Sequence, residues 1–179
     1  MVFVPLCGKT KDMLWLREQG HRVLGVELSA IAVQAFFGDN GYAPEHTSNG
    51  AFSCSDANGI RILCGDFFDL NKSDLVQVSA VYDRAAMIAL PSEMRLRYAR
   101  HLAAILPAAT QLLLVTVEYP QTEMQGPPFS VSSSEVDTLF GSTADVHLLA
   151  QRDALEQNPH LQQRGLSRLQ ENVYRAKTR

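Results

Sequence analysis

The sequence lacks the features that mark several large classes of protein. Its three cysteines are an odd number without zinc spacing, which argues against both a disulfide framework and a zinc site. Apolar runs such as residues 112–117 are far too short to cross a bilayer. The net charge is -3 and no run of Lys or Arg stands out, which argues against bulk electrostatic binding to nucleic acid. We therefore expect a cytoplasmic protein that binds neither membranes nor nucleic acid.

Several catalytic motifs are also missing. There is no G-x-S-x-G nucleophile elbow, no G-x-x-x-x-G-K-[ST] phosphate loop and no G-x-G-x-x-G dinucleotide fingerprint. The five histidines are scattered, and none is paired with an acid or a cysteine at ligand spacing. Cys7 lies beside a predicted helix N-terminus, which can lower a thiol pKa, but we interpret it as a small packing residue. We therefore expect no metal site and assign no catalytic residue.

What is present indicates an α/β protein. Hydrophobic residues make up 46% and charged residues 20% of 179 residues, which favours a single globular domain over residues 1–179. Strand-like and helix-like segments alternate, which predicts a parallel sheet with helices on both faces. The last two strand-like segments have no good helix between them, so we expect an antiparallel pair at one edge.

Residues 1–27 contain the most informative stretch. Val2–Val4 reads as a buried strand, Asp12–Gln19 as a helix that stops at Gly20, and Arg22–Leu28 as a second strand ending in the acid Glu27. This is the first half of a nucleotide-binding sheet. Gly8, in the loop after the first strand, lets a ligand approach the backbone, and Glu27 follows about 20 residues later, where a carboxylate can accept both hydroxyls of a ribose.

The remaining elements follow from periodicity and turn residues. We expect helices over Ser29–Asp39, Ser92–Leu106 and, from a Ser132/Glu135 capping box, up to Phe140. The buried face of the second of these helices should contain Leu96, Ala99, Leu102, Ala103 and Leu106. Further strands are predicted over Ala51–Ser55, Ile60–Cys64, Ala80–Asp83, Gln111–Val117, Asp145–Ala150 and Leu169–Ala176, with a turn-rich segment at Gly38–Gly50.

Candidate binding residues gather at the carboxyl ends of the predicted parallel strands, where such sheets bind ligands. They are Leu6, Cys7 and Gly8, then Glu27, then Asp66 and Phe67, and finally Asp83 and Arg84. Each also has a structural explanation: Glu27 and Asp66 suit helix caps or solvated turns, and Phe67 suits the core. Asp83 and Arg84 could form an ion pair. The set as a whole suits an adenosine, with a glycine loop, an acid for the ribose, and an acid and an aromatic ring for the base.

Five stretches carry a resemblance to a known family. They are Val4-Pro5-Leu6-Cys7-Gly8-Lys9, Gly25-Val26-Glu27-Leu28-Ser29, Asp66-Phe67-Phe68-Asp69-Leu70, Tyr82-Asp83-Arg84-Ala85-Ala86 and Gly126-Pro127-Pro128-Phe129. In this order they resemble the motifs of thiopurine S-methyltransferases, which use S-adenosylmethionine. The resemblance implies a Rossmann-like class I methyltransferase fold with a mostly parallel seven-stranded sheet and an antiparallel edge pair.

The same resemblance implies roles for individual residues. Leu6, Gly8, Glu27 and Arg84 would contact the cofactor, and Asp66 and Phe67 would lie around its adenine. Arg84, together with Pro128 and Phe129 of the G-P-P-F stretch, would contact the acceptor. No residue matches the family's basic position before the last strand, where this sequence reads Glu156-Gln157-Asn158-Pro159-His160.

The expected activity is methyl transfer from S-adenosylmethionine to the sulfur of a small aromatic or heterocyclic thiol, such as a thiopurine, by a monomer. The resemblance extends the expected acceptors to selenium and tellurium compounds. Two alternatives stay open. One is an NAD-dependent oxidoreductase, because Glu27 fits the ribose of that cofactor equally well. The other is a cofactor-binding core with little activity, because the family carries a lid segment before the first strand and this sequence starts at that strand.

Overall fold

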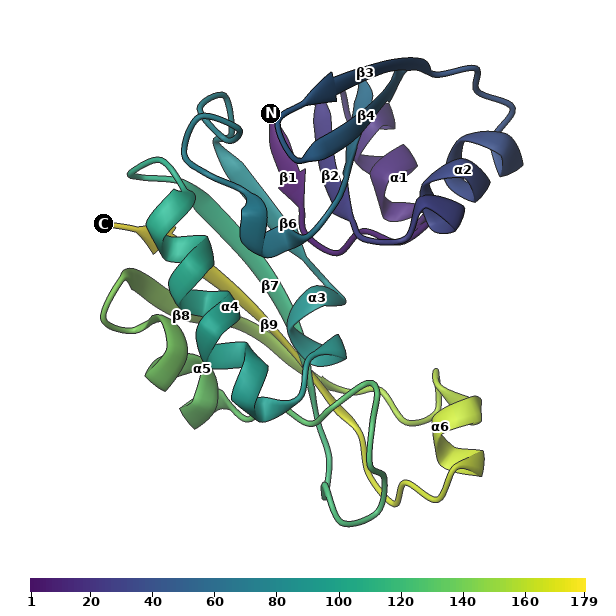
Figure 1. Cartoon of the computed structure of the whole chain (residues 1–179). Helices are drawn as coiled ribbons and strands as arrows, with labels where there is room; N and C mark the ends of the chain where they lie inside the picture. The colour runs from purple at the N-terminus through teal and green to yellow at the C-terminus, as the bar shows by residue number, and fades with distance from the viewer. The chain divides into compact units, whose positions relative to one another are not determined.

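The chain forms two units in the computed structural model, which describes all of residues 1–179 (Figure 1). The first unit contains Met1–Tyr82 and Ile105–Pro107, and the second contains Asp83–Ala104 and Ala108–Arg179. The expectation of a single domain over residues 1–179 stays a prediction.

Six strands form the sheet of the first unit. They are β1 (Val2–Val4), β2 (Val23–Glu27), β3 (Glu45–Asn49), β4 (Phe52–Ala57), β5 (Ile60–Cys64) and β6 (Ala80–Asp83), in the order β3-β4-β5-β2-β1-β6. β1 is parallel to β2 and β6, and β2 is parallel to β5, so their carboxyl ends meet at one edge. β4 runs antiparallel to β3 and β5. A hairpin turn joins β4 to β5, and Asn58 and Gly59 have φ of +53° and +77°, as a type I′ turn requires.

The helices of the first unit cover one hydrophobic cluster. They are α1 (Asp12–Glu18) and α2 (Ala30–Asp39), and a single 3₁₀ turn, η1 (Phe67–Asp69), follows β5. Ser29 caps α2, because its Oγ accepts the N–H of Ala32 at 3.2 Å. The cluster joins buried residues of both helices to strand residues: Met13, Leu16, Val33, Phe36 and Phe37 with Val2, Val4, Val23, Ile60 and Ile62. This cluster fixes the two helices against the strands whose ends carry the candidate site.

An antiparallel three-stranded sheet forms the core of the second unit. Its strands are β7 (Gln111–Glu118), β8 (Ala144–Asp153) and β9 (Gln170–Thr178), in the order β7-β9-β8. The pairing of β8 with β9 confirms the predicted antiparallel pair. The helices are α3 (Ala86–Ala89), α4 (Ser92–Ile105), α5 (Ser133–Phe140) and α6 (Pro159–Gln163). α4 and α5 lie side by side (Figure 1), and Arg95 of α4 binds Glu135 of α5.

The strand prediction is incomplete in one segment. Residues 38–50 are predicted to be turn-rich, yet Glu45–Asn49 form β3. All five of its side chains are exposed, so no alternation of apolar and polar residues marks this strand. Backbone pairing with β4 stabilises it instead. The chain therefore has nine strands instead of seven, with β3 and β4 as an antiparallel extension of the sheet.

The buried face of α4 also differs from the prediction. Leu96 is 40% exposed, whereas Arg95 is 4% exposed and Tyr98 is fully buried. These polar side chains can be buried because both have partners: Arg95 pairs with Glu135, and Tyr98 Oη donates a 2.7 Å hydrogen bond to Asp83 Oδ2. A hydrophobic pattern cannot identify such positions, because the residues that satisfy them lie far away in the sequence.

Asp83 is a buried acid at the end of β6. Its Oδ1 accepts the N–H of Met87 at 3.2 Å, so it caps α3, while its Oδ2 accepts the Tyr98 hydroxyl. Its side chain is thus engaged by α3 and α4. Burial raises the pKa of Asp83 from 3.8 to about 6, and the hydrogen bonds from Tyr98 and from the α3 amides oppose this rise.

We predict that Asp83 makes stability depend on pH. Because the folded-state pKa is raised, the contribution of Asp83 is complete below its ordinary pKa of 3.8 and is lost as the pH rises through about 6. The free energy of unfolding, measured in urea, should therefore fall by about 2–3 kcal/mol between about pH 4 and pH 7, relative to an Asp83→Asn variant that does not titrate. Parallel pH profiles for the two proteins would contradict this prediction.

Candidate active site

The loop after β1 is held against the tip of β2 by one carboxylate. Glu27 Oε2 accepts the N–H of Gly8 at 2.8 Å, and Glu27 Oε1 accepts the N–H of Ser29 at 2.7 Å. The loop also donates from Cys7 N–H to the carbonyl of Val26 at 2.9 Å. Glu27 therefore sits between the β1–α1 loop and the start of α2, as its position in the sequence predicts.

Two residues of this loop adopt left-handed backbone conformations. Gly8 has a φ of +52°, which suits glycine, and a Cβ built there would meet no atom within 4 Å. Leu6 has a φ of +44°, which is unusual for a residue with a side chain. Backbone strain of this kind gathers at binding sites, where the surrounding structure maintains it. The open space at Gly8 leaves room for a ligand beside the backbone.

Glu27 retains the capacity to bind hydroxyl groups. It is half-buried, and an ionised carboxylate offers about four acceptor positions, of which the two amides use two. About two positions are left for donors such as the vicinal hydroxyls of a ribose. The amide contacts hold the carboxylate in one orientation, so little side-chain entropy is lost when a ligand binds.

Close packing between the loop and β2 explains why position 25 is a glycine and why Cys7 is buried. A Cβ at Gly25 would lie 2.7 Å from Cys7 Sγ, so a side chain there would displace the thiol. Cys7 is buried, and burial raises the pKa of its thiol, with the charge of Glu27 adding to this effect. The packing interpretation of Cys7 is therefore confirmed. No cluster of three or more His, Cys, Asp or Glu side chains is placed to hold a metal ion.

The predicted residues after β5 lie in the 3₁₀ turn η1. Asp66 Oδ1 accepts the N–H of Phe68 at 2.9 Å, so the capping interpretation of Asp66 applies, although the side chain is exposed. Phe67 is 5% exposed and belongs to the core, while Phe68 is half-buried and packs edge-to-face against it, with 5.3 Å between ring centroids. A direct contact of Phe67 with a ligand stays a prediction.

Leu28 is a candidate that sequence reasoning missed. It follows Glu27 directly and is 73% exposed, which is unusual for a leucine beside a buried strand. An apolar side chain beside an acid at the end of a strand offers a surface for a flat ring. The sequence feature that could have identified Leu28 is its position directly after Glu27, at the end of the predicted strand.

Arg84 lies in the second unit, between the end of β6 and α3, and is exposed. Asp83, its neighbour, is the acid that we considered as an ion-pair partner of Arg84. The two carboxylate oxygens of Asp83 accept hydrogen bonds from Tyr98 and from the α3 backbone. α3, a four-residue helix that the sequence did not predict, begins two residues after Arg84.

The G-P-P-F stretch lies in the loop between β7 and α5, and several hydrogen bonds hold this loop. Phe129 N–H donates to the carbonyl of Ile88 at 2.7 Å, and Tyr119 Oη donates to the carbonyl of Pro128 at 2.5 Å. Gly126 has a φ of +87°, and a Cβ there would lie 2.5 Å from the ring of Phe129. Position 126 must therefore be a glycine for the Phe129 ring to pack over the loop, which explains why Gly126 precedes Phe129 by three residues in the G-P-P-F stretch.

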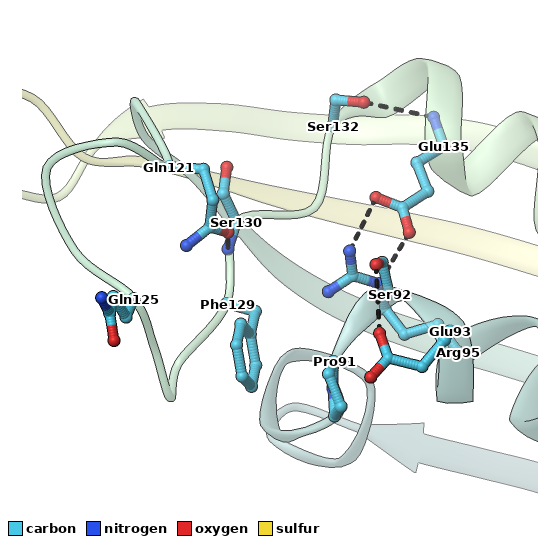
Figure 2. A pocket seen from close by; sticks show the side chains of 10 residues that line it. All are labelled: Pro91, Ser92, Glu93, Arg95, Gln121, Gln125, Phe129, Ser130, Ser132 and Glu135. Carbon is cyan, nitrogen blue, oxygen red and sulfur yellow. Dashed lines mark hydrogen bonds and ion pairs between the residues drawn. The ribbon is translucent and has the colours of Figure 1, made fainter.

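Phe129 lines a pocket of about 550 Å³ within the second unit, shown in Figure 2. The loop and the N-terminal ends of α4 and α5 form its walls. The lining residues are Pro91, Ser92, Glu93, Arg95, Gln121, Gln125, Phe129, Ser130, Ser132 and Glu135. Phe129 thus lines a pocket, and the carbonyl of Pro128 accepts the Tyr119 hydroxyl. Contact of either residue with an acceptor stays a prediction.

Comparison with known proteins decides the family. The model of the family described as thiopurine S-methyltransferase (TPMT) matches residues 1–179. A thiopurine S-methyltransferase of Nitrosospira multiformis is 58% identical over 178 residues, which cover 99% of this chain and 81% of the relative. The chain belongs to the thiopurine S-methyltransferase family. A relative of the same name from Methylococcus capsulatus is 50% identical and covers 97% of this chain and 78% of its own length.

Solved structures support the fold of this family member. The YcgJ protein of Bacillus subtilis covers 99% of this chain and 91% of its own, with a TM-score of 0.68 at 13% identity. A methyltransferase of Methanosarcina mazei that depends on S-adenosylmethionine gives the same TM-score, identity and coverage. The predicted Rossmann-like methyltransferase fold is confirmed.

This thiopurine S-methyltransferase family member is an enzyme that uses S-adenosylmethionine as its methyl donor. The oxidoreductase alternative is therefore not supported. A structural neighbour, a Burkholderia thailandensis N1-methyltransferase with bound S-adenosylhomocysteine, has a TM-score of 0.63 at 14% identity and covers 99% of this chain and 70% of its own. No helix of the chain is long and apolar enough to span a membrane.

We predict that Glu27 carries a large share of the affinity for the cofactor. Each hydrogen bond to a charged group contributes about 1.5–3 kcal/mol, so Glu27→Ala should weaken the binding of S-adenosylhomocysteine by about 10- to 150-fold. Isothermal titration calorimetry would measure the change. Circular dichroism should barely change, although the Gly8 and Ser29 amides lose their partner.

Glu18→Ala is the matched control, because Glu18 is an exposed acid on α1 away from the strand ends. Its dissociation constant for S-adenosylhomocysteine should equal that of the unmodified chain. An unchanged dissociation constant in Glu27→Ala would show that Glu27 only holds the two loops together.

Proposed function

We propose that this enzyme transfers a methyl group from S-adenosylmethionine to the sulfur of small aromatic or heterocyclic thiols such as thiopurines. The main support is its 58% identity to a relative named thiopurine S-methyltransferase, over nearly the whole chain. The pocket beside Phe129 adds support, because it has the volume and the aromatic wall that a small ring needs. Selenium and tellurium compounds are further acceptors in this proposal.

The chain's own residues bind and orient the reactants. Leu6 and Gly8 line the strained loop, and Glu27 accepts hydrogen bonds from the ribose hydroxyls. Asp66 and Phe67 flank the adenine, and Arg84 contacts both cofactor and acceptor. Phe129, carried by the loop that Pro128 helps to anchor, contacts the ring of the acceptor.

The reaction is a displacement at carbon. When bound, S-adenosylmethionine supplies a methyl group that its positively charged sulfur activates. A lone pair of the acceptor sulfur forms the new carbon–sulfur bond, and the electrons of the old bond stay on the departing sulfur, which gives S-adenosylhomocysteine. The thiol proton goes to solvent. A thiolate is already a strong nucleophile near neutral pH, so the contribution of the protein is alignment, and we assign no general base.

A matched pair of acceptors tests this function. The purified chain would be incubated with S-adenosylmethionine and either a mercaptopurine or the corresponding hydroxypurine, and the products would be identified by mass spectrometry. We expect a methyl thioether from the thiol and no transfer to the oxygen analogue. A parallel incubation with a selenium compound would test that class of acceptor. Binding of S-adenosylhomocysteine without methylation of any thiol would contradict the proposal.

We predict that Arg84 orients the reactants through its planar guanidinium group. Arg84→Lys keeps the charge but loses the fork of parallel N–H donors, so kcat/KM for the thiol should fall by about 10- to 100-fold. The thermal midpoint should change little, because Arg84 is exposed. Arg100→Lys, an exposed arginine of α4, is the matched control and should keep the parent rate. A parent rate in Arg84→Lys would exclude the orienting role.

A further inference from the structure

An ion pair between Arg95 and Glu135 forms part of the lining of the pocket in the second unit. Arg95 Nε donates to Glu135 Oε1 at 2.6 Å, and Arg95 Nη2 donates to Glu135 Oε2 at 3.1 Å, while Nη1 donates to the carbonyl of Leu90 at 3.1 Å. Arg95 is 4% exposed. Figure 2 shows the two side chains facing each other between α5 and the N-terminal end of α4. The guanidinium charge is therefore neutralised at close range.

The lining carries one carboxylate in excess. Arg95 is its one basic residue, and Glu93 and Glu135 are its acids. Because Glu135 forms an ion pair with Arg95, Glu93 carries the remaining negative charge of the lining. Glu93 is exposed, accepts a 3.4 Å hydrogen bond from Ser92 Oγ, and takes part in no ion pair.

Two other polar side chains of the lining already make hydrogen bonds within the protein. Gln121 Nε2 donates to the carbonyl of Met124 at 2.5 Å, and Gln121 Oε1 accepts the N–H of Ser130 at 3.0 Å. Ser132 Oγ accepts the N–H of Glu135 at 3.2 Å and so caps α5. Outside the Arg95–Glu135 pair, the carboxylate of Glu93 is thus the one charged group of the lining that can recognise a ligand.

One wall of the pocket is a flat ring held in place. The N–H of Phe129 is bonded to Ile88, and its ring packs over Gly126, where a Cβ would come within 2.5 Å. In Figure 2 this ring stands beside Pro91 and faces into the space between the loop and α4. A planar aromatic ligand can stack on such a wall without reordering it.

We infer that this pocket takes the ring of the acceptor and that Glu93 makes it select uncharged or cationic rings over anionic ones. The inference rests on the proposed function, because it names the class of thiol that the enzyme prefers. A ring N–H of a nitrogen heterocycle donates to Glu93, while a carboxylate or an oxyanion is repelled, since no basic group in the lining is left to balance it.

Two thiols of equal size test the selection. 4-Mercaptobenzamide and 4-mercaptobenzoate differ in charge but hardly in shape. We expect the amide to have a kcat/KM about 3- to 10-fold higher than the acid, the size of effect that one partly solvated charge produces. This ratio should fall toward one in Glu93→Gln, and also at high salt, because Glu93 is exposed to screening ions.

Glu156→Gln is the matched control, since it removes the same charge from an exposed position of the second unit outside the pocket. Its ratio should equal that of the unmodified chain. A ratio that is unchanged in Glu93→Gln, or that falls equally in Glu156→Gln, would overturn the inference.

The inference and the proposed function can fail separately. If neither thiol is methylated, the proposed function fails, and calorimetric titration of the two thiols into the chain still tests the pocket. Tighter binding of the amide, lost in Glu93→Gln, would support the selection by charge. Equal binding of the amide and the acid would overturn it.

Discussion

The carboxylate of Glu27 determines the geometry of the strand ends in the first unit. It bonds to backbone amides on either side of it, Gly8 in the β1–α1 loop and Ser29 at the start of α2. These are charge-assisted hydrogen bonds, each of which contributes about 1.5–3 kcal/mol. They help to maintain the left-handed backbone of Leu6 and Gly8, and they orient the same carboxylate toward a ligand. One side chain therefore serves both the architecture and the proposed binding of the cofactor.

The second unit depends on polar contacts buried along α4. Tyr98 reaches Asp83 at the end of β6, and Arg95 reaches Glu135 at the start of α5. A buried ion pair of this kind is weak evidence for stability, because the cost of desolvation offsets much of the attraction. Its value here is geometric. It connects α4 to α5, the helix that follows the Phe129 loop, while Tyr98 of α4 binds Asp83 beside Arg84. Both proposed acceptor-binding segments are therefore tied to α4.

The sequence identified the parts of the site that depend on local patterns. The run from β1 to Glu27 and the helix over Ser29–Asp39 follow from neighbouring residues, and the structure agrees with them. Long-range pairing caused the errors. β3 has no apolar alternation and exists because β4 pairs with it. Ser132 caps α5 as the predicted capping box requires, but the Glu135 side chain bonds to Arg95 instead of returning to the cap.

The sequence by itself determined the order of the main strands and helices, the acid at the tip of β2 and the family motifs, because helix periods, turn residues and caps act over a few residues. Only the tertiary structure decided which face of α4 is buried and where the charge of the pocket beside Phe129 lies. Arg95 and Glu135 are 40 positions apart, so no local pattern shows that one neutralises the other. Because Arg95 and Glu135 pair, Glu93 is the remaining charged residue of the pocket lining. This arrangement depends on distances in space, which the spacing of the residues along the chain does not show.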